Sequence, residues 1–359
     1  MRISQIQQTL TQSGAKPIHT DRILRAWLSG RALDAGPRKH AAAKTLPLSV
    51  RAALPELETT LGRFAIPERQ HPDTDGSTRL LVRLADGQTV ESVLLPKKGV
   101  CVSTQLGCAV GCTFCMTGKS GLLRQLTSGE ILAQVVLARR LRPETTLRRV
   151  VFMGMGEPAH NLENVCDAID ALGTWGGIGH KNLVVSSVGD PRLFPRLLAG
   201  RVKPALALSL HSAHHVTRRA LLPRAPDLTP KALIDAGEAY ARATGYPIQY
   251  QWTLLAGVND SEEELAGITR LLHGKYAMLN LIPCNENPGQ NHQRPTLPAI
   301  IAMTRRLNRA GILTRIRHSA GQEVEGGCGQ LRARSVQVSD VRGQASGIKT
   351  EATPLRAIA

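Results

Sequence analysis

The sequence predicts an α/β protein, a partial (β/α) barrel that follows a small N-terminal helical domain and a connecting β-hairpin. Three observations lead to this fold class. Residues 1–65 are short amphipathic stretches broken by glycine and proline, residues 78–95 alternate apolar and polar side chains, and from residue 99 apolar runs alternate with helical patterns. Such a series of βαβ units builds a parallel sheet with helices outside it.

The patterns divide the chain into four parts. Residues 1–77 are expected to form the helical domain, and residues 78–98 a β-hairpin that turns at Asp86-Gly87 and links the two domains. Residues 99–335 are expected to form the partial barrel. Residues 336–359 are polar and rich in Gly, Ser and Thr, which predicts a flexible C-terminal tail.

The barrel strands are expected where short apolar runs occur. These runs are 100–104, 150–153, 183–187, 205–210, 248–254, 278–282 and 313–316. The helix after the first run should begin near Thr127, a hydroxyl cap that is followed by the acidic Glu130. Active sites of parallel barrels lie at the carboxyl ends of the strands, so the loop after the first strand should lie in the active site.

Composition indicates a polyanionic partner. The 359 residues carry a net charge of +17, and phosphate backbones are the commonest partner for such an excess. Only 3% of residues are aromatic, which disfavours a platform that stacks many bases and favours shape and phosphate contacts. The chain lacks an apolar run of about 18 residues and a signal-peptide pattern, so we expect no membrane span and a cytoplasmic, monomeric protein.

Three cysteines in the loop after the first strand carry the most specific signal. Cys108, Cys112 and Cys115 have the spacing Cys-x-x-x-Cys-x-x-Cys, typical of the [4Fe-4S] ligands of radical S-adenosylmethionine (SAM) enzymes. Three thiolates leave one iron of the cube free to chelate SAM. A zinc site is the alternative, with a fourth ligand from His160, His211 or Cys328. A disulfide framework is disfavoured because the seven cysteines are an odd number in a long chain.

Several further motifs occur in a diagnostic order. They are the cysteine loop, Gly154-Met155-Gly156-Glu157-Pro158, Ser209-Leu210-His211, Val258-Asn259-Asp260, Asn280-Leu281-Ile282-Pro283 and Cys328-Gly329-Gln330-Leu331. In this order they resemble the radical SAM RNA adenine methyltransferases, which methylate carbon 2 of adenine in 23S ribosomal RNA and transfer RNA and have relatives that act at carbon 8. The resemblance runs from about residue 14 to 334. It implies a [4Fe-4S] cluster, SAM, a structured RNA substrate, an N-terminal domain that helps to bind RNA, and a reductase or flavodoxin-type electron donor.

The resemblance also implies catalytic roles for three residues. Cys328 would carry the methyl group as S-methylcysteine, and Cys101 would release the product by a transient disulfide with Cys328. Glu91 would accept the proton of the adenine ring. Without the resemblance, the cysteines would be interpreted as small buried hydrophobic residues and the glutamate as a solvated side chain. Cys166 and Cys284 keep that structural interpretation.

The same resemblance implies a set of SAM contacts. They are Gly156, Glu157, Ser186, Ser209, Leu210, His211 and Asn285. His211 taken alone would be interpreted as a core histidine. The sequence departs from the family around Asn285 and after the cluster loop, which bears on the choice of RNA. Carbon-8 methylation, or methylation of another RNA, therefore stays open. So does a different class of protein, a zinc-stabilised RNA-binding protein without catalysis.

Overall fold

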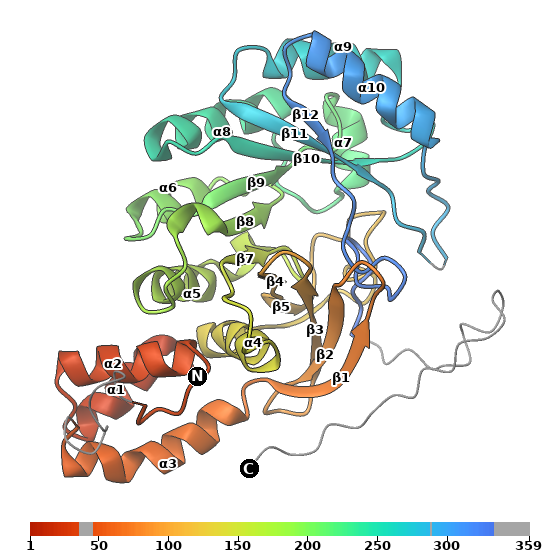
Figure 1. Cartoon of the computed structure of the whole chain (residues 1–359). Coiled ribbons are helices and arrows are strands. Elements are labelled where there is room, and N and C mark those ends of the chain that lie inside the picture. Colours follow the sequence, from red (N-terminus) through yellow and green to blue (C-terminus); the bar gives the residue numbers. More distant parts are fainter. Residues whose placement is uncertain (36–45, 288, 334–359) are drawn as a thin grey trace, which may run out of the picture.

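The computed structural model describes residues 1–35, 46–287 and 289–333 (Figure 1). The tail expected at 336–359 lies outside these ranges. Helices α1 (Ile3–Gln12), α2 (Pro17–Leu28) and α3 (Leu48–Gly62) come first. Their apolar faces pack together through buried side chains that include Ile6, Leu24 and Leu57. Burial of one face of each amphipathic helix is what holds this N-terminal unit together.

One ten-stranded sheet forms the centre of the molecule. Its strands lie in the order β1 (Ile66–Pro72), β2 (Thr78–Arg83), β3 (Thr89–Leu95), β4 (Gly99–Cys101), β7 (Arg149–Phe152), β8 (Leu183–Ser187), β9 (Ala205–Ser209), β10 (Ile248–Leu254), β11 (Ala277–Pro283) and β12 (Thr314–Ile316). The first four strands pair antiparallel, and every pair from β4 to β12 is parallel. The α/β fold class and the open barrel of parallel strands are therefore confirmed.

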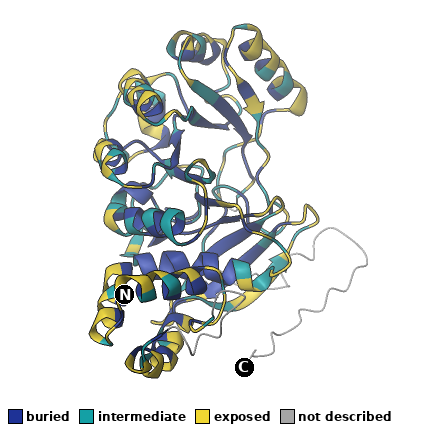
Figure 2. Cartoon of the chain, turned by 60° about the vertical axis from the view of Figure 1, so that its left-hand side comes forward, coloured by how far each residue is buried: buried dark blue, intermediate teal, exposed yellow. Residues whose placement is uncertain are grey.

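Helices cover the outer side of the curved sheet (Figure 1). They are α4 (Ser128–Leu141), α5 (Leu162–Thr174), α6 (Leu193–Ala199), α7 (His215–Leu221), α8 (Pro230–Thr244), α9 (Glu262–Leu272) and α10 (Leu297–Arg309), with the short 3₁₀ turns η2 (Pro158–Asn161) and η3 (His180–Asn182). Figure 2 shows buried strands behind helices whose outer faces are exposed. The hydroxyl of Thr127 caps α4, as the sequence predicts, by accepting a hydrogen bond from the Glu130 amide at 3.3 Å. Among the described residues, no helix is both long and apolar enough to span a bilayer.

The predicted hairpin at 78–95 forms, but it does not act as a separate linker. Its second strand, β3, pairs with β4, so that the hairpin extends the barrel sheet. A further strand, β1, pairs with β2 and was not predicted, because its sequence Ile-Pro-Glu-Arg-Gln-His-Pro is polar and contains two prolines. Proline is tolerated in a strand at a sheet edge, which is where β1 lies.

The first predicted barrel strand, 100–104, is shorter than expected. Strand β4 ends at Cys101, and farther on the Thr104 amide donates to the Met155 carbonyl at 2.8 Å. A small antiparallel pair follows, β5 (Gln105–Gly107) with β6 (Leu122–Gln125). This pair holds the two ends of the cysteine loop together.

The β5–β6 pair depends on Gly107. Its φ is +77°, and a Cβ at this position would overlap the carbonyl oxygen of Gly121, which accepts a hydrogen bond from the Cys108 amide. We expect Gly107→Ala to lower the free energy of unfolding by more than about 3 kcal/mol, because the loop backbone must move. Thermal unfolding followed by circular dichroism measures this loss.

Gly87→Ala is the matched control. Gly87 also has a positive φ, +83°, but a Cβ there would meet nothing within 4 Å. Only the cost of the left-handed conformation remains, about 1 kcal/mol. Equal decreases in the free energy of unfolding of the two variants would contradict the role given to the Gly107–Gly121 contact.

Candidate active site

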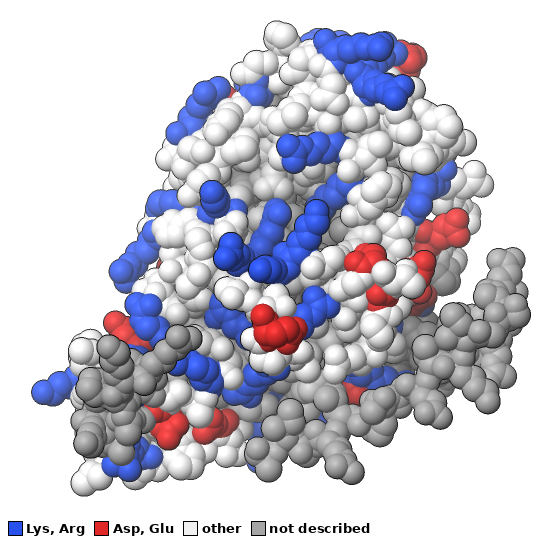
Figure 3. Space-filling view, viewed as in Figure 1, with Lys and Arg blue, Asp and Glu red and all other residues white. Residues whose placement is uncertain are grey.

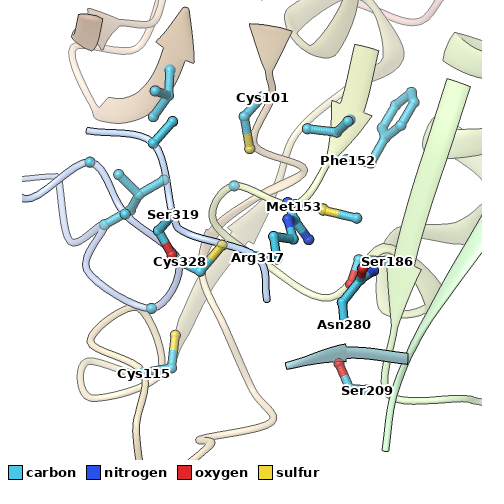
Figure 4. A pocket seen from close by; sticks show the side chains of 18 of the residues that line it. Cys101, Cys115, Phe152, Met153, Ser186, Ser209, Asn280, Arg317, Ser319 and Cys328 are labelled. Carbon is cyan, nitrogen blue, oxygen red and sulfur yellow. Dashed lines mark hydrogen bonds between the residues drawn. The ribbon is translucent and has the colours of Figure 1, made fainter. Parts of the chain in front are cut away.

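A cavity of about 740 Å³ lies inside the curve of the sheet. Five cysteines that the sequence analysis identified line this cavity. They are Cys101, Cys108, Cys112, Cys115 and Cys328. Figure 4 shows Cys101 at the end of its strand, with Cys115 and Cys328 on loops from the other side of the cavity. Residues far apart in the sequence therefore meet in one cavity.

The cluster loop, residues 108–118, supplies three of these thiols. The Cys115 amide donates to the Cys112 carbonyl at 3.0 Å, and a Cβ at Gly118 would lie 2.7 Å from Gly111 Cα, so the loop is tightly folded. Burial raises the pKa of Cys108 to about 11, and burial together with the two neighbouring thiols raises the pKa of Cys112. Free thiolates are therefore unfavourable here, whereas bonding to iron stabilises the thiolate form.

The three thiols of the cluster loop are electrostatic neighbours. In the described part of the chain, no three His, Cys, Asp or Glu side chains are grouped closely enough to hold a single metal ion. The thiolates of a four-iron cube each bind a different iron, so they lie farther apart than ligands of one zinc ion. Phe114 packs its ring edge against His211 at a centroid distance of 4.8 Å, which closes the loop against the barrel.

The loop 326–331 places Cys328 against the cluster loop. The Met116 amide donates to the Gly329 carbonyl at 2.7 Å, and the Thr117 hydroxyl donates to the Leu331 carbonyl at 2.7 Å. A glycine is required at position 329, where φ is +81° and a Cβ would lie 2.9 Å from the Phe114 carbonyl. The two loops thus touch backbone to backbone, with Cys328 facing the cavity.

Cys101 and Cys328 are electrostatic neighbours. Burial raises the pKa of Cys101 to about 12, and the nearby Cys328 raises it further in the same direction. Both cysteines are free thiols in this structure. Cys328 also raises the pKa of Cys115, after the larger effect of burial. Cys328 therefore interacts electrostatically with both Cys101 and Cys115 of the cluster loop.

Glu157 follows β7 and is buried at the cavity wall. Its carboxylate accepts hydrogen bonds from the amides of Ala159 and Val188, both at 3.0 Å. Burial raises the pKa of Glu157 to about 7. The neighbouring Gly156 has a φ of +103°, and a Cβ there would lie 2.5 Å from Gln105 Cβ, so only glycine fits.

Most of the other expected SAM contacts also line the cavity. Ser186, Ser209 and His211 do so. His211 has a φ of +57°, and its Nδ1 accepts a hydrogen bond from the Thr253 amide at 2.9 Å. The remaining proton therefore sits on Nε2, and burial lowers the pKa of His211 to about 3, so the ring is neutral.

Two of the expected SAM contacts do not line the cavity. Leu210 is buried in the core behind it. Asn285 is also buried, and its amide donates to the Cys328 carbonyl at 3.0 Å and to the Ser319 hydroxyl at 3.2 Å. Asn285 thus holds the Cys328 loop in this structure. Cys166 lies in the core on α5, and Cys284 packs in a small apolar cluster beside Cys108.

Glu91 is fully buried and lies outside the cavity lining. Its exposed fraction is 0%, so the interpretation as a solvated side chain is wrong. The carboxylate forms an ion pair with Arg79 and accepts hydrogen bonds from the amides of Arg332 at 2.7 Å and Ala333 at 3.0 Å. Burial raises the pKa of Glu91. The segment that follows Cys328 therefore covers this carboxylate.

Two residues that shape the site, Gln134 and Arg317, were not found from the sequence. Gln134 accepts hydrogen bonds from the Ser92 hydroxyl at 2.6 Å and the Ser103 amide at 2.9 Å, which fixes the turn after Cys101. Arg317 lines the cavity and donates to the Gln251 side chain at 2.8 Å. Neither lies in a recognisable motif, so single-sequence reasoning had no signal for them.

Comparisons with known proteins agree with this geometry. The model of the radical SAM superfamily matches residues 102–267. A "Probable RNA methyltransferase" of Stutzerimonas stutzeri is 62% identical and covers 94% of this chain and 98% of its own length. One from Thiobacillus denitrificans is 61% identical over 95% of this chain and 93% of its own.

A solved structure shares the fold over nearly the whole chain. It is a radical SAM methyltransferase from Sphaerobacter thermophilus, with a TM-score of 0.81 and 34% identity, and the match covers 93% of this chain and 98% of that one. The chain belongs to the radical SAM superfamily and, within it, to the family of these methyltransferases.

Proposed function

We propose that the protein methylates carbon 2 of an adenine in structured RNA, 23S ribosomal RNA or transfer RNA, through a methylated Cys328. One observation carries the proposal: Cys101 and Cys328 line the same cavity as the three cysteines of the cluster loop. The printed names of the relatives support RNA as the substrate, and so does the net charge of +17.

The cofactors follow from the family, which uses a [4Fe-4S] cluster and SAM, so the zinc interpretation is set aside. Cys108, Cys112 and Cys115 would hold the cluster. Gly156, Glu157, Ser186, Ser209 and His211 would contact SAM from the cavity wall, with Leu210 and Asn285 behind them. When bound, these cofactors supply a methyl group and the power to remove hydrogen from an unactivated C–H bond.

Such chemistry suits the proposed target. The amidine carbons of adenine are electron-poor, so they do not take a methyl group as ordinary nucleophiles would. The thiol of Cys328 would first lose its proton and accept the methyl group. The methyl carbon would then lose one hydrogen atom, as the bound cofactors allow, and bond to the ring carbon of the base. The Cys328 loop lies against the cluster loop, which gives the sulfur access to both reactants within the cavity.

Release of the product would require Glu91 and Cys101. Glu91 would accept the proton lost from the ring carbon, and its raised pKa suits a proton acceptor. Because the amides of Arg332 and Ala333 cover its carboxylate, this segment must move away before the proton is transferred. The Cys101 thiolate would then attack the Cys328 sulfur, so that an S–S bond forms as the bond from the Cys328 sulfur to the methylene carbon breaks. The electron pair of the broken bond would go to that carbon, which takes up a proton and becomes the methyl group of the product.

We further propose that a flavodoxin-type protein or a reductase supplies the electrons, and that the protein acts as a cytoplasmic monomer. Methylation at carbon 8, or of another RNA, is the alternative outcome. The two carbons differ in the position that the base must take in the cavity, so product analysis separates them.

Replacing Cys328 tests the methyl carrier. We expect Cys328→Ala to yield no methyladenosine, whereas the native protein, loaded with its cluster and supplied with SAM and a reductant under anaerobic conditions, yields 2-methyladenosine. Mass spectrometry of nucleosides from treated ribosomal and transfer RNA is the measurement. Cys166→Ala is the control, because Cys166 is buried on α5 and does not line the cavity. A fully active Cys328→Ala protein would refute the proposal, and 8-methyladenosine would correct the target carbon.

Replacing Glu91 tests the proton acceptor. We expect Glu91→Gln to keep Cys328 methylation but to accumulate a covalent protein–RNA adduct, because the ring proton is no longer removed. Denaturing gel electrophoresis with labelled RNA detects the adduct. The change also leaves the buried Arg79 without its ion pair, which costs about 3–5 kcal/mol, so thermal unfolding is measured in parallel. Normal turnover by a folded variant would remove Glu91 from the mechanism.

A further inference from the structure

Four cations line the same cavity as the thiols. These residues are Lys97, Arg149, Arg315 and Arg317. Arg149 is the first residue of β7, and Gln249 and Met278, near the starts of β10 and β11, line the cavity as well. The cavity therefore runs from the carboxyl ends of the strands, where the thiols lie, to their amino ends. Figure 3 shows Lys and Arg side chains gathered along a hollow in the middle of one face.

The curvature of the sheet brings two of these cations together. Arg149 on β7 and Arg317 just after β12 are separated by four intervening strands in the sheet order. They are nevertheless electrostatic neighbours, because burial and then Arg317 lower the pKa of Arg149. Arg315 and Arg317 are two residues apart and both line the cavity, as expected for alternate side chains of an extended segment. Like charges thus converge from distant strands of the barrel.

The protein does not neutralise this group within its described residues. None of the four cations forms an ion pair there. Of the acids that line the cavity, Asp75 accepts hydrogen bonds from the Ser77 and Gly321 amides, and Glu157 accepts those of Ala159 and Val188. A cluster of guanidinium groups at a concave surface favours an anion with several acceptor oxygens, and phosphate matches this geometry.

We propose that Arg149 and Arg315, with Lys97 on the same cavity lining and Arg317 farther in, form a phosphate-binding site at the mouth of the barrel for the RNA backbone next to the target nucleotide. The proposal rests on RNA being the substrate. Arg317 faces inward, since it lowers the pKa of Cys101 after the larger, opposing effect of burial. The cavity wall also carries apolar groups, Val151, Phe152 and Met153, and Val151 is level with Cys101 in the sheet. A phosphate held at the mouth leaves its nucleoside free to enter along this wall toward Cys101 and Cys328.

The test is the salt dependence of RNA binding by the full-length protein carrying its cluster. The probe is a fluorescein-labelled RNA hairpin with an adenosine in its loop, and anisotropy gives Kd from 50 to 300 mM KCl. We expect Arg149→Gln with Arg315→Gln to weaken binding about tenfold and to reduce the slope of log Kd against log salt by about 1.5, because two phosphate contacts are lost. Arg149→Lys with Arg315→Lys should largely restore both values.

A double variant on α10 controls for net charge. Arg305→Gln with Arg309→Gln removes two exposed cations on the outer helix, away from the cavity lining, and should leave the slope unchanged. Equal losses of RNA affinity and salt slope in the two glutamine variants would contradict the proposed site. Unchanged values in the Arg149→Gln, Arg315→Gln variant would contradict it as well. Thermal unfolding and iron content show that each variant is folded and loaded. Competition by inorganic phosphate at matched ionic strength would show that the site takes free phosphate as well as the RNA backbone.

The binding result is separable from the proposed reaction. If the Arg149→Gln, Arg315→Gln variant has a reduced salt slope but the native protein produces no methyladenosine, the phosphate site is supported and the proposed reaction is wrong. If methyladenosine forms and the mouth variants bind RNA as the native protein does, the reaction stands and the site is wrong.

Discussion

The contact between the cluster loop and the Cys328 loop is the constraint on which the rest of the site depends. A hydrogen bond of 2.7 Å from the Met116 amide to the Gly329 carbonyl joins segments more than two hundred residues apart, and a second bond from Thr117 to Leu331 reinforces it. Buried main-chain bonds of this kind leave little freedom, because breaking one exposes an unpaired polar group. With the two loops joined, Cys328 shares a cavity with the cluster cysteines.

The carboxylate of Glu91 extends this constraint to the antiparallel side of the sheet. It binds the amides of Arg332 and Ala333, just beyond the Cys328 loop, while Arg79 neutralises it from the neighbouring strand. A buried charge with three partners is stable only while all of them stay in place. The same contacts that hold the Cys328 loop therefore also cover the proposed proton acceptor. Movement of one segment would uncover Glu91 and release Cys328 together, which couples the two roles mechanically.

The sequence predicted the fold better than it predicted the site. Strands β8 and β10 have the predicted bounds, because apolar runs buried on both faces are recognisable from local sequence. The polar edge strand β1 was missed, since its pairing with β2 does not show in its own composition. The burial of Glu91 was missed for a similar reason, as its partners Arg332 and Ala333 lie about 240 residues away in the chain. Periodicity reports how a segment packs locally, whereas charge pairing across the fold requires the structure.

The open barrel reconciles two demands that conflict in a single small site. Radical chemistry needs an enclosed environment of low polarity, whereas binding a polyanion needs cations that remain accessible to it. In this protein the thiols lie at the carboxyl ends of the strands, and the same cavity reaches Arg149 at the amino end of β7. A closed barrel would fill this interior with side chains. Because β12 is short and the sheet does not close, the interior stays continuous, so one cavity serves both demands.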